Sequence, residues 1–296
     1  MSALLEVTDL RLQFGGVKAV DGLSFEVHEG EILAVIGPNG AGKTSAFNCI
    51  SAFYLPTSGS VVFDGKRIVR KAPSIWHRLR LVNLLQSFGF YRVLPSRVTK
   101  WGMARTFQNL RLFRELSVLD NVKTAMHANL RENFWSTLLH TPGYHRAEEA
   151  CAREARGWLD FVGFEGDENL YVTHLPYGEQ RRVEIARALA TSPKLLLLDE
   201  PAAGLNFNEK QALMSLIRKI RTLGVAVVLI EHDMGLVMNL AERIVVLNYG
   251  KEIADGTPEQ VKNDPVVIEA YLGVEEDDEP TPGAEPVRDG GNEARS

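Results

Sequence analysis

The feature that most constrains the fold of this chain is a glycine-rich loop that follows a short apolar run. The run at residues 32–36 is ILAVI, and the loop at 37–44 reads GPNGAGKT, which matches the pattern G-x-x-x-x-G-K-[ST]. A helical stretch follows the loop through Ala52. Glycines let the backbone wrap phosphate groups, with amide N–H groups pointing inward at the start of a helix. The order of strand, loop and helix therefore predicts an α/β fold that binds phosphate.

The loop also predicts roles for its charged and hydroxyl side chains. Lys43 would neutralise phosphate charge, and the hydroxyl of Thr44 would be a ligand of Mg²⁺. We therefore expect ATP and Mg²⁺ as the cofactors. The predicted ATP-binding residues of the loop are Gly37, Pro38, Asn39, Gly40, Ala41, Gly42, Lys43, Thr44 and Ser45.

Two later apolar runs end in side chains suited to hydrolysis. Four leucines at 195–198 precede Asp199 and Glu200. In a phosphate-loop enzyme, an aspartate at this strand end holds Mg²⁺, usually through water, and the next acid can act as general base toward the attacking water. His232 follows the run VAVVLIE at 225–231, so it could contact the γ-phosphate from the neighbouring strand. The alternatives are an ordinary buried strand and a structural histidine.

The remaining pattern indicates a layered domain. Residues 4–12 and 23–35 alternate like antiparallel strands, and about 115–170 is helical, which suggests a separate helical lobe. LLLLDE, GVAVVLIE and RIVVLN predict strands of a mostly parallel sheet that is buried on both faces. Two cysteines provide no disulfide framework, and no apolar run reaches the length of a spanning helix. The net charge of −5 argues against a surface that binds nucleic acid throughout, so we expect a cytoplasmic globular protein.

The segment LPYGEQRRVEIARAL, at residues 175–189, resembles the signature of ABC transporter ATPases, and it precedes the acidic strand as in that family. Gly178 would open an amphipathic helix whose N-terminus can receive phosphate. The resemblance implies a head-to-tail dimer in which this segment faces the ATP held by the partner subunit. The residues it implies for that contact are Pro176, Tyr177, Gly178 and Glu179.

Three further positions match the same family. Gln108, in ARTFQNLRLF, lies where the family has a glutamine that senses Mg²⁺ and the attacking water, so the resemblance makes it a catalytic and metal-side residue. Phe14 matches the aromatic residue that stacks on adenine, although a phenylalanine beside a strand is more often part of a core. The loop at 203–206 has Asn206 where aspartate is commoner.

The resemblance implies an α/β phosphate-loop ABC ATPase with a mixed, mainly parallel sheet, an antiparallel β subdomain and a helical subdomain at about 109–175. We expect this ATPase domain to span 1–274. Residues 275–296 are acidic and polar and are expected to be disordered. An atypical basic and apolar insert at about 68–98 could pack on its own domain, contact membrane or permease, or bind nucleic acid.

Several segments together resemble the LivG type of branched-chain amino acid importer ATPase, among them LDEPAAGLN, IEHDMGLVM and the closing DGTPEQ. That implies a second ATPase in a heterodimer, with a homodimer possible, and two permease subunits served by a periplasmic solute-binding protein. It places the chain on the inner face of the cell membrane, without nucleic acid. Urea or amide import and lipopolysaccharide export are alternatives, and an ABC ATPase acting on nucleic acid or ribosomes is a further one.

The signature departs from the family pattern at Pro176, where serine is usual. Proline has neither the serine hydroxyl nor an N–H group. One hypothesis is that the composite site loses a charge-assisted hydrogen bond, worth about 1.5–3 kcal/mol, which weakens hydrolysis there. The alternative is that Gly178 and the helix N–H groups suffice.

Overall fold

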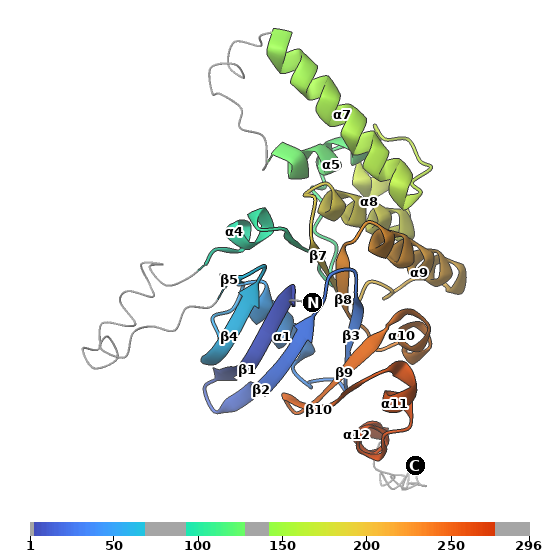
Figure 1. Cartoon of the computed structure of the whole chain (residues 1–296). Helices are drawn as coiled ribbons and strands as arrows, with labels where there is room; N and C mark the ends of the chain where they lie inside the picture. The colour runs from blue at the N-terminus through green and yellow to red at the C-terminus, as the bar shows by residue number, and fades with distance from the viewer. Residues whose placement is uncertain (1–2, 69–92, 128–141, 276–296) are drawn as a thin grey trace, which may run out of the picture.

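A mixed sheet forms the centre of the computed structural model, which describes residues 3–68, 93–127 and 142–275 (Figure 1). Its six strands lie in the order β10-β9-β3-β8-β7-β6. All neighbours pair in parallel except β10, which is antiparallel to β9 at one edge. The strands are β3 (Ile32–Ile36), β6 (Met103–Arg105), β7 (Leu195–Asp199), β8 (Ala226–Ile230), β9 (Arg243–Asn248) and β10 (Lys251–Gly256).

A smaller antiparallel sheet covers one side of the molecule, drawn in blue in Figure 1. Its order is β2-β1-β4-β5, built from β1 (Leu5–Phe14), β2 (Val17–Val27), β4 (Ser58–Phe63) and β5 (Lys66–Arg67). The antiparallel strands predicted from the N-terminal sequence are therefore confirmed up to Val27. The prediction was wrong for the end of the run 23–35, because a turn at 28–31 carries the chain into β3, which pairs in parallel in the other sheet.

Helix α1 (Lys43–Ile50) lies between the two sheets. Its buried side chains, Phe47 and Ile50 among them, share one apolar cluster with residues of β1, β2 and β4 and with one face of the mixed sheet. The strands alternate as the period of two requires: Leu33 and Val35 of β3 belong to this cluster, whereas Ile32 and its i+2 neighbours belong to the cluster on the opposite face. Both faces of the central sheet are therefore buried, as predicted.

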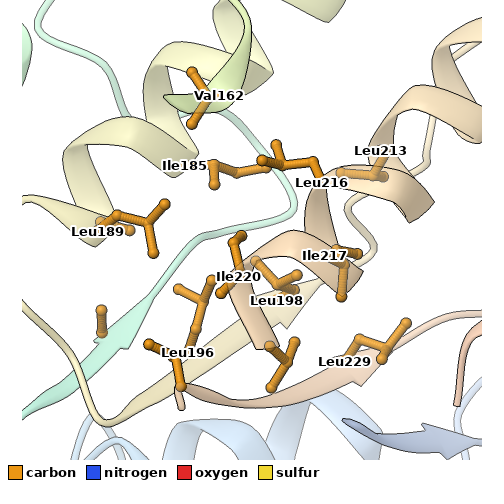
Figure 2. Close-up of a cluster of buried hydrophobic side chains, with 14 of the residues drawn as sticks. Val162, Ile185, Leu189, Leu196, Leu198, Leu213, Leu216, Ile217, Ile220 and Leu229 are labelled. Carbon is orange, nitrogen blue, oxygen red and sulfur yellow. The ribbon is translucent and has the colours of Figure 1, made fainter. Parts of the chain in front are cut away.

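Helices cover the second face of the mixed sheet. Figure 2 shows Leu196 and Leu198 of β7 beneath Ile217 and Ile220 of α9 (Phe207–Thr222), with Ile185 of α8 (Tyr177–Leu189) above them. All five of these side chains are fully buried. Apolar residues three apart on α9 thus form the stripe that seats it on the sheet.

The helices expected between 115 and 170 are α5 (Val118–His127) and α7 (Pro142–Val162), and α8 packs against both. These helices stand together at one end of the molecule (Figure 1). The predicted lobe boundary at 175 falls just before α8. The other helices are α4 (Pro95–Lys100), the 3-10 turn η1 (Val172–His174), α10 (Met234–Leu240), α11 (Pro258–Lys262) and α12 (Pro265–Glu275).

Two predicted segments lie mainly outside the described residues. These are positions 69–92 of the basic insert and positions 276–296 of the acidic tail, so the roles considered for them stay predictions. In the part of the chain that the structure describes, no helix has the length and apolar character needed to cross a bilayer.

We expect Leu196→Ala to lower the free energy of unfolding by about 2–5 kcal/mol, because it removes fully buried atoms and leaves a cavity beneath α9. The matched control is Leu223→Ala, at a position that is 50% exposed and should change stability by less than about 0.5 kcal/mol. Urea unfolding of both variants checks this. Equal midpoints for the two variants would contradict the packing described for β7.

Candidate active site

The phosphate loop has no room for side chains at two of its glycines. A Cβ atom on Gly42 would lie 2.1 Å from the carbonyl oxygen of Ala19, and one on Gly37 would lie 2.0 Å from that of Leu247. Both glycines have positive φ, 99° and 149°. Gly42 is the N-cap of α1 and supplies no side-chain cap, so the first N–H groups of this helix remain available to an anion.

The side chain of Lys43 folds back onto the phosphate loop. Its Nζ donates hydrogen bonds to the carbonyl oxygens of Gly37 at 2.6 Å and Pro38 at 3.0 Å. Burial lowers the pKa of Lys43, although the nearby carboxylates of Glu200 and Asp199 oppose that shift. The amine therefore sits among acceptors inside the loop, close to where the backbone N–H groups can receive phosphate.

A cavity of about 400 Å³ opens beside the loop. Glu200 lines it together with Tyr249, and Thr44 of the loop is exposed there. The rest of its lining comes from β2 and the loop: Val17, Lys18, Ala19, Asn39, Gly40, Ala41, Gly42, Lys43 and Ser45. The structure thus brings most of the residues predicted from the loop to one cavity.

Phe14 lies near this cavity without lining it. It ends β1, opposite Val17 in the hairpin, and it is 51% exposed. Its ring meets that of Tyr54 edge-on at 5.5 Å between centroids. The stacking of Phe14 on adenine stays a prediction.

Asp199 is a buried carboxylate with one paired and one unpaired oxygen. It is 2% exposed, and its Oδ2 forms an ion pair with Arg105 at 2.9 Å. Its Oδ1 has no hydrogen-bond partner among the described residues. Burial raises the pKa of Asp199, and the hydrogen bond and charge of Arg105 oppose that rise. A buried carboxylate oxygen left without a donor suits a water ligand of a metal ion.

The residues present fit a magnesium ion that is held largely by its nucleotide. The described residues contain no cluster of three or more His, Cys, Asp or Glu side chains that could form a protein-only metal site. Mg²⁺ commonly binds through one or two protein groups, several waters and substrate phosphates. Thr44, Asp199 and Gln108 could supply those protein groups.

Glu200 brings the three predicted catalytic residues together. Its Oε2 accepts a hydrogen bond from Nε2 of Gln108 at 2.8 Å, and Nδ1 of His232 lies 4.0 Å from the same oxygen. The backbone N–H of Glu200 donates to the carbonyl of Ile230 at 3.0 Å, which ties the end of β7 to the end of β8. Glu200 has a φ of +46°, a left-handed conformation that costs a non-glycine residue roughly 1–2 kcal/mol.

The signature segment begins α8 one residue earlier than expected. Tyr177 is the first helical residue, and Pro176 is its N-cap with φ −55° and ψ 153° and no side-chain cap. A Cβ on Gly178 would lie 2.5 Å from Oε1 of Glu209, so this position packs closely on α9. Burial raises the pKa of Glu179. None of these four signature residues lines the cavity beside the phosphate loop of the same chain.

Comparison with known proteins decides the family. The model of the ABC transporter family matches residues 20–203, which is more than half of the chain. The chain belongs to the ABC transporter family. A second model, for branched-chain amino acid ATP-binding cassette transporters, matches residues 251–277, which include β10, α11 and α12.

Relatives of this ABC ATPase extend over most of its length. The high-affinity branched-chain amino acid transport ATP-binding protein BraF of Pseudomonas aeruginosa is 43% identical over 272 residues, covering 91% of this chain and 98% of BraF. LivG of Escherichia coli (strain K12) is 42% identical over the same shares. The ADP conformation of MJ1267, an ATP-binding cassette of an ABC transporter, superposes with a TM-score of 0.73 at 28% identity, covering 92% of this chain and all of MJ1267. The predicted family and fold class are confirmed.

The motifs gave no role to two charged residues beside the predicted site, Glu231 and Arg105. Glu231 is 1% exposed and accepts hydrogen bonds from the N–H groups of Ala202 at 2.8 Å and His232 at 3.3 Å, so it joins the loop after β7 to the loop after β8. Burial raises the pKa of Glu231. Arg105 is the second. Each could have been noticed in the sequence as a charged residue inside or beside an apolar run and close to a predicted site residue.

We expect Gly42→Ala to weaken ATP binding at least tenfold, because the new Cβ meets the Ala19 carbonyl and displaces the start of α1. The control is Gly157→Ala, a helical position in α7 with no atom within 4 Å of the added Cβ. It should bind ATP like the unchanged protein. Titration of a fluorescent ATP analogue measures both affinities, and unchanged binding by Gly42→Ala would refute the close contact.

Proposed function

We propose that this ABC ATPase binds and hydrolyses ATP to power uptake of branched-chain amino acids through a separate permease. The convergence of Gln108, Glu200 and His232 beside the phosphate loop is the observation that supports hydrolysis. The amino acid assignment is supported by the identity to BraF and LivG over nearly their full length. The match of residues 251–277 to the branched-chain amino acid model also supports it.

The proposed reaction uses groups of the phosphate loop and of the adjoining strand ends. The N–H groups at the start of α1 and the ammonium of Lys43 bind the phosphates of ATP. Glu200 orients the attacking water and accepts its proton, while water adds to the γ-phosphorus and ADP leaves. Gln108 holds the carboxylate of Glu200 by its hydrogen bond, and His232 lies beside the same oxygen.

Thr44, Asp199 and Gln108 are the residues that would hold Mg²⁺. When bound, the ion supplies positive charge that neutralises the phosphate oxygens. The unpaired Oδ1 of buried Asp199 supports its share of this role.

Assembly with other chains completes the proposed site. Pro176, Tyr177, Gly178 and Glu179 contact the ATP of a second ATPase subunit in a head-to-tail dimer. Two permease subunits bind this pair at the inner face of the cell membrane, and a periplasmic binding protein delivers the solute to them. Gln108 follows β6 and precedes α5, so its movement on nucleotide binding is passed through α5, α7 and α8 to the permease.

Copurification from native membranes tests this function. Tagged protein is isolated in mild detergent, and its partners are identified by mass spectrometry. We expect a second, distinct ATPase, two permeases and a binding protein, and the binding protein's bound solute is then identified directly. Recovery with copies of itself and an export permease would overturn amino acid uptake, and recovery with nucleic acid or ribosomes and no permease would overturn transport.

We expect Glu200→Gln to lower the ATPase rate of the isolated complex at least a hundredfold, because glutamine cannot accept the proton of the attacking water. ATP affinity should change less than about threefold, since the phosphate-binding groups remain in place. Glu259→Gln is the matched control, an exposed side chain in the first turn of α11, and it should keep the full ATPase rate. Full activity in Glu200→Gln would remove Glu200 from the catalytic step.

A further inference from the structure

A single guanidinium joins the three chain segments that deliver the predicted metal-side residues. Arg105 ends β6, three residues before Gln108, and it contacts both β7 and α1. We infer that Arg105 is a positioning residue, which sets Asp199 against Thr44 and Gln108 so that the nucleotide is bound together with its Mg²⁺. This inference rests on the proposed function for the presence of Mg²⁺ at the site.

Both terminal nitrogens of the Arg105 guanidinium donate hydrogen bonds. Its Nη2 donates to Oδ2 of Asp199 at 2.9 Å, while its Nη1 donates to Oδ1 of Asn48 and to Oγ of Ser51, each at 2.8 Å. Ser51 donates its own hydroxyl to the carbonyl of Phe47 at 2.6 Å, which leaves its lone pairs for Arg105. One side chain thus links β6, β7 and the C-terminal end of α1.

These contacts are held in a buried, ring-lined site. The side chain of Arg105 is 6% exposed and that of Asp199 is 3% exposed. The guanidinium lies over the rings of Phe47, Phe53 and Phe107, with 5.8, 5.6 and 5.0 Å from its carbon to the ring centroids. Aromatic faces favour a cation there and restrict where the guanidinium can move. The ion pair is therefore fixed in direction, unlike the exposed pairs of the surface.

The direction matters because Arg105 binds only one oxygen of Asp199. The other oxygen, Oδ1, stays without a partner among the described residues. On α1, Asn48 is four residues after Thr44, so both lie on the same face of the helix. Arg105 therefore binds both the carboxylate of Asp199 and the face of α1 that carries Thr44. These two contacts fix the spacing between two predicted Mg²⁺ ligands.

A purely structural salt bridge is the competing explanation. Breaking a buried ion pair destabilises most folds, so loss of activity in an Arg105 variant would not separate the two roles. Arg105→Lys keeps the charge, but an ammonium is a point charge and cannot span Asp199, Asn48 and Ser51 with the geometry of a planar fork. The measurement must then distinguish metal-linked binding from binding in general.

The test is the gain in ATP affinity that Mg²⁺ provides. The dissociation constant of a fluorescent ATP analogue is measured for the full chain in EDTA and in excess Mg²⁺. The value in EDTA divided by the value in Mg²⁺ is then compared between variants. We expect Arg105→Lys to reduce this ratio about tenfold, as for other residues that orient a metal ligand. Affinity in EDTA should stay within about twofold, because the loop is untouched.

Two control variants give the results expected for no effect and for complete loss of the metal contribution. Arg243→Lys changes another arginine that bridges two carboxylates, Glu31 and Asp255, each at 2.8 Å, and its ratio should equal that of the unchanged protein. Asp199→Asn should lose the gain in affinity altogether, so that its dissociation constants in EDTA and in Mg²⁺ are equal. If Asp199→Asn keeps it, the metal site of the proposed function is wrong. If only Arg105→Lys keeps it, the positioning role is wrong and the metal site stands.

A second variant covers the case in which Arg105→Lys does not fold. Asn48→Ala removes one of the two contacts to α1 and keeps the ion pair, so we expect a two- to fivefold loss of the ratio, in line with one hydrogen bond. An unchanged ratio in Asn48→Ala would overturn the link through α1. Equal losses of affinity in Mg²⁺ and in EDTA, in either variant, would show a general scaffold and also overturn the inference.

Discussion

The phosphate loop is held between two other stretches of backbone, and the rest of the site depends on that contact. Gly250, in the turn between β9 and β10, donates its N–H to the carbonyl of Ala41 at 3.0 Å and accepts from the N–H of Asp21 at 2.7 Å. The carbonyl of Ala19 lies where a Cβ of Gly42 would be. The loop therefore touches both sheets through main-chain atoms. This close approach fixes the start of α1, and with it the positions of Lys43 and Thr44.

Parallel pairing explains why residues far apart in sequence meet at that loop. In the mixed sheet β8 lies between β3 and β7, so the loops after these three strands emerge at the same edge. They carry Lys43, His232 and Glu200. Gln108 arrives from β6, on the other side of β7. The meeting of these predicted site residues thus follows from strand order, because each lies in the segment that follows its strand.

The sequence predicted those parts of the site whose signal is local. The glycine spacing of the phosphate loop, and the polar residues that end apolar runs at Asp199, Glu200 and His232, are readable because strand and loop are contiguous. Arg105 was missed because its partners lie 57, 54 and 94 residues away, and no period connects them. The change from antiparallel β2 to parallel β3 was missed because pairing direction depends on strands that are distant in sequence. Strand order, likewise, depends on pairings that no single run reveals.

The charged groups buried near the nucleotide site cost the fold some stability. Arg105 and Asp199 are almost wholly desolvated, Glu231 is 1% exposed, and Glu200 has a left-handed backbone. Apolar residues of similar volume often stabilise such positions as well or better. The buried side chains are instead hydrogen-bonded to the next segment of the site, Arg105 to α1 and Glu231 to the loop after β7, while the backbone N–H of Glu200 bonds to the end of β8. Their common effect is to fix the relative positions of the strand ends, and hydrolysis requires that geometry more than the fold does.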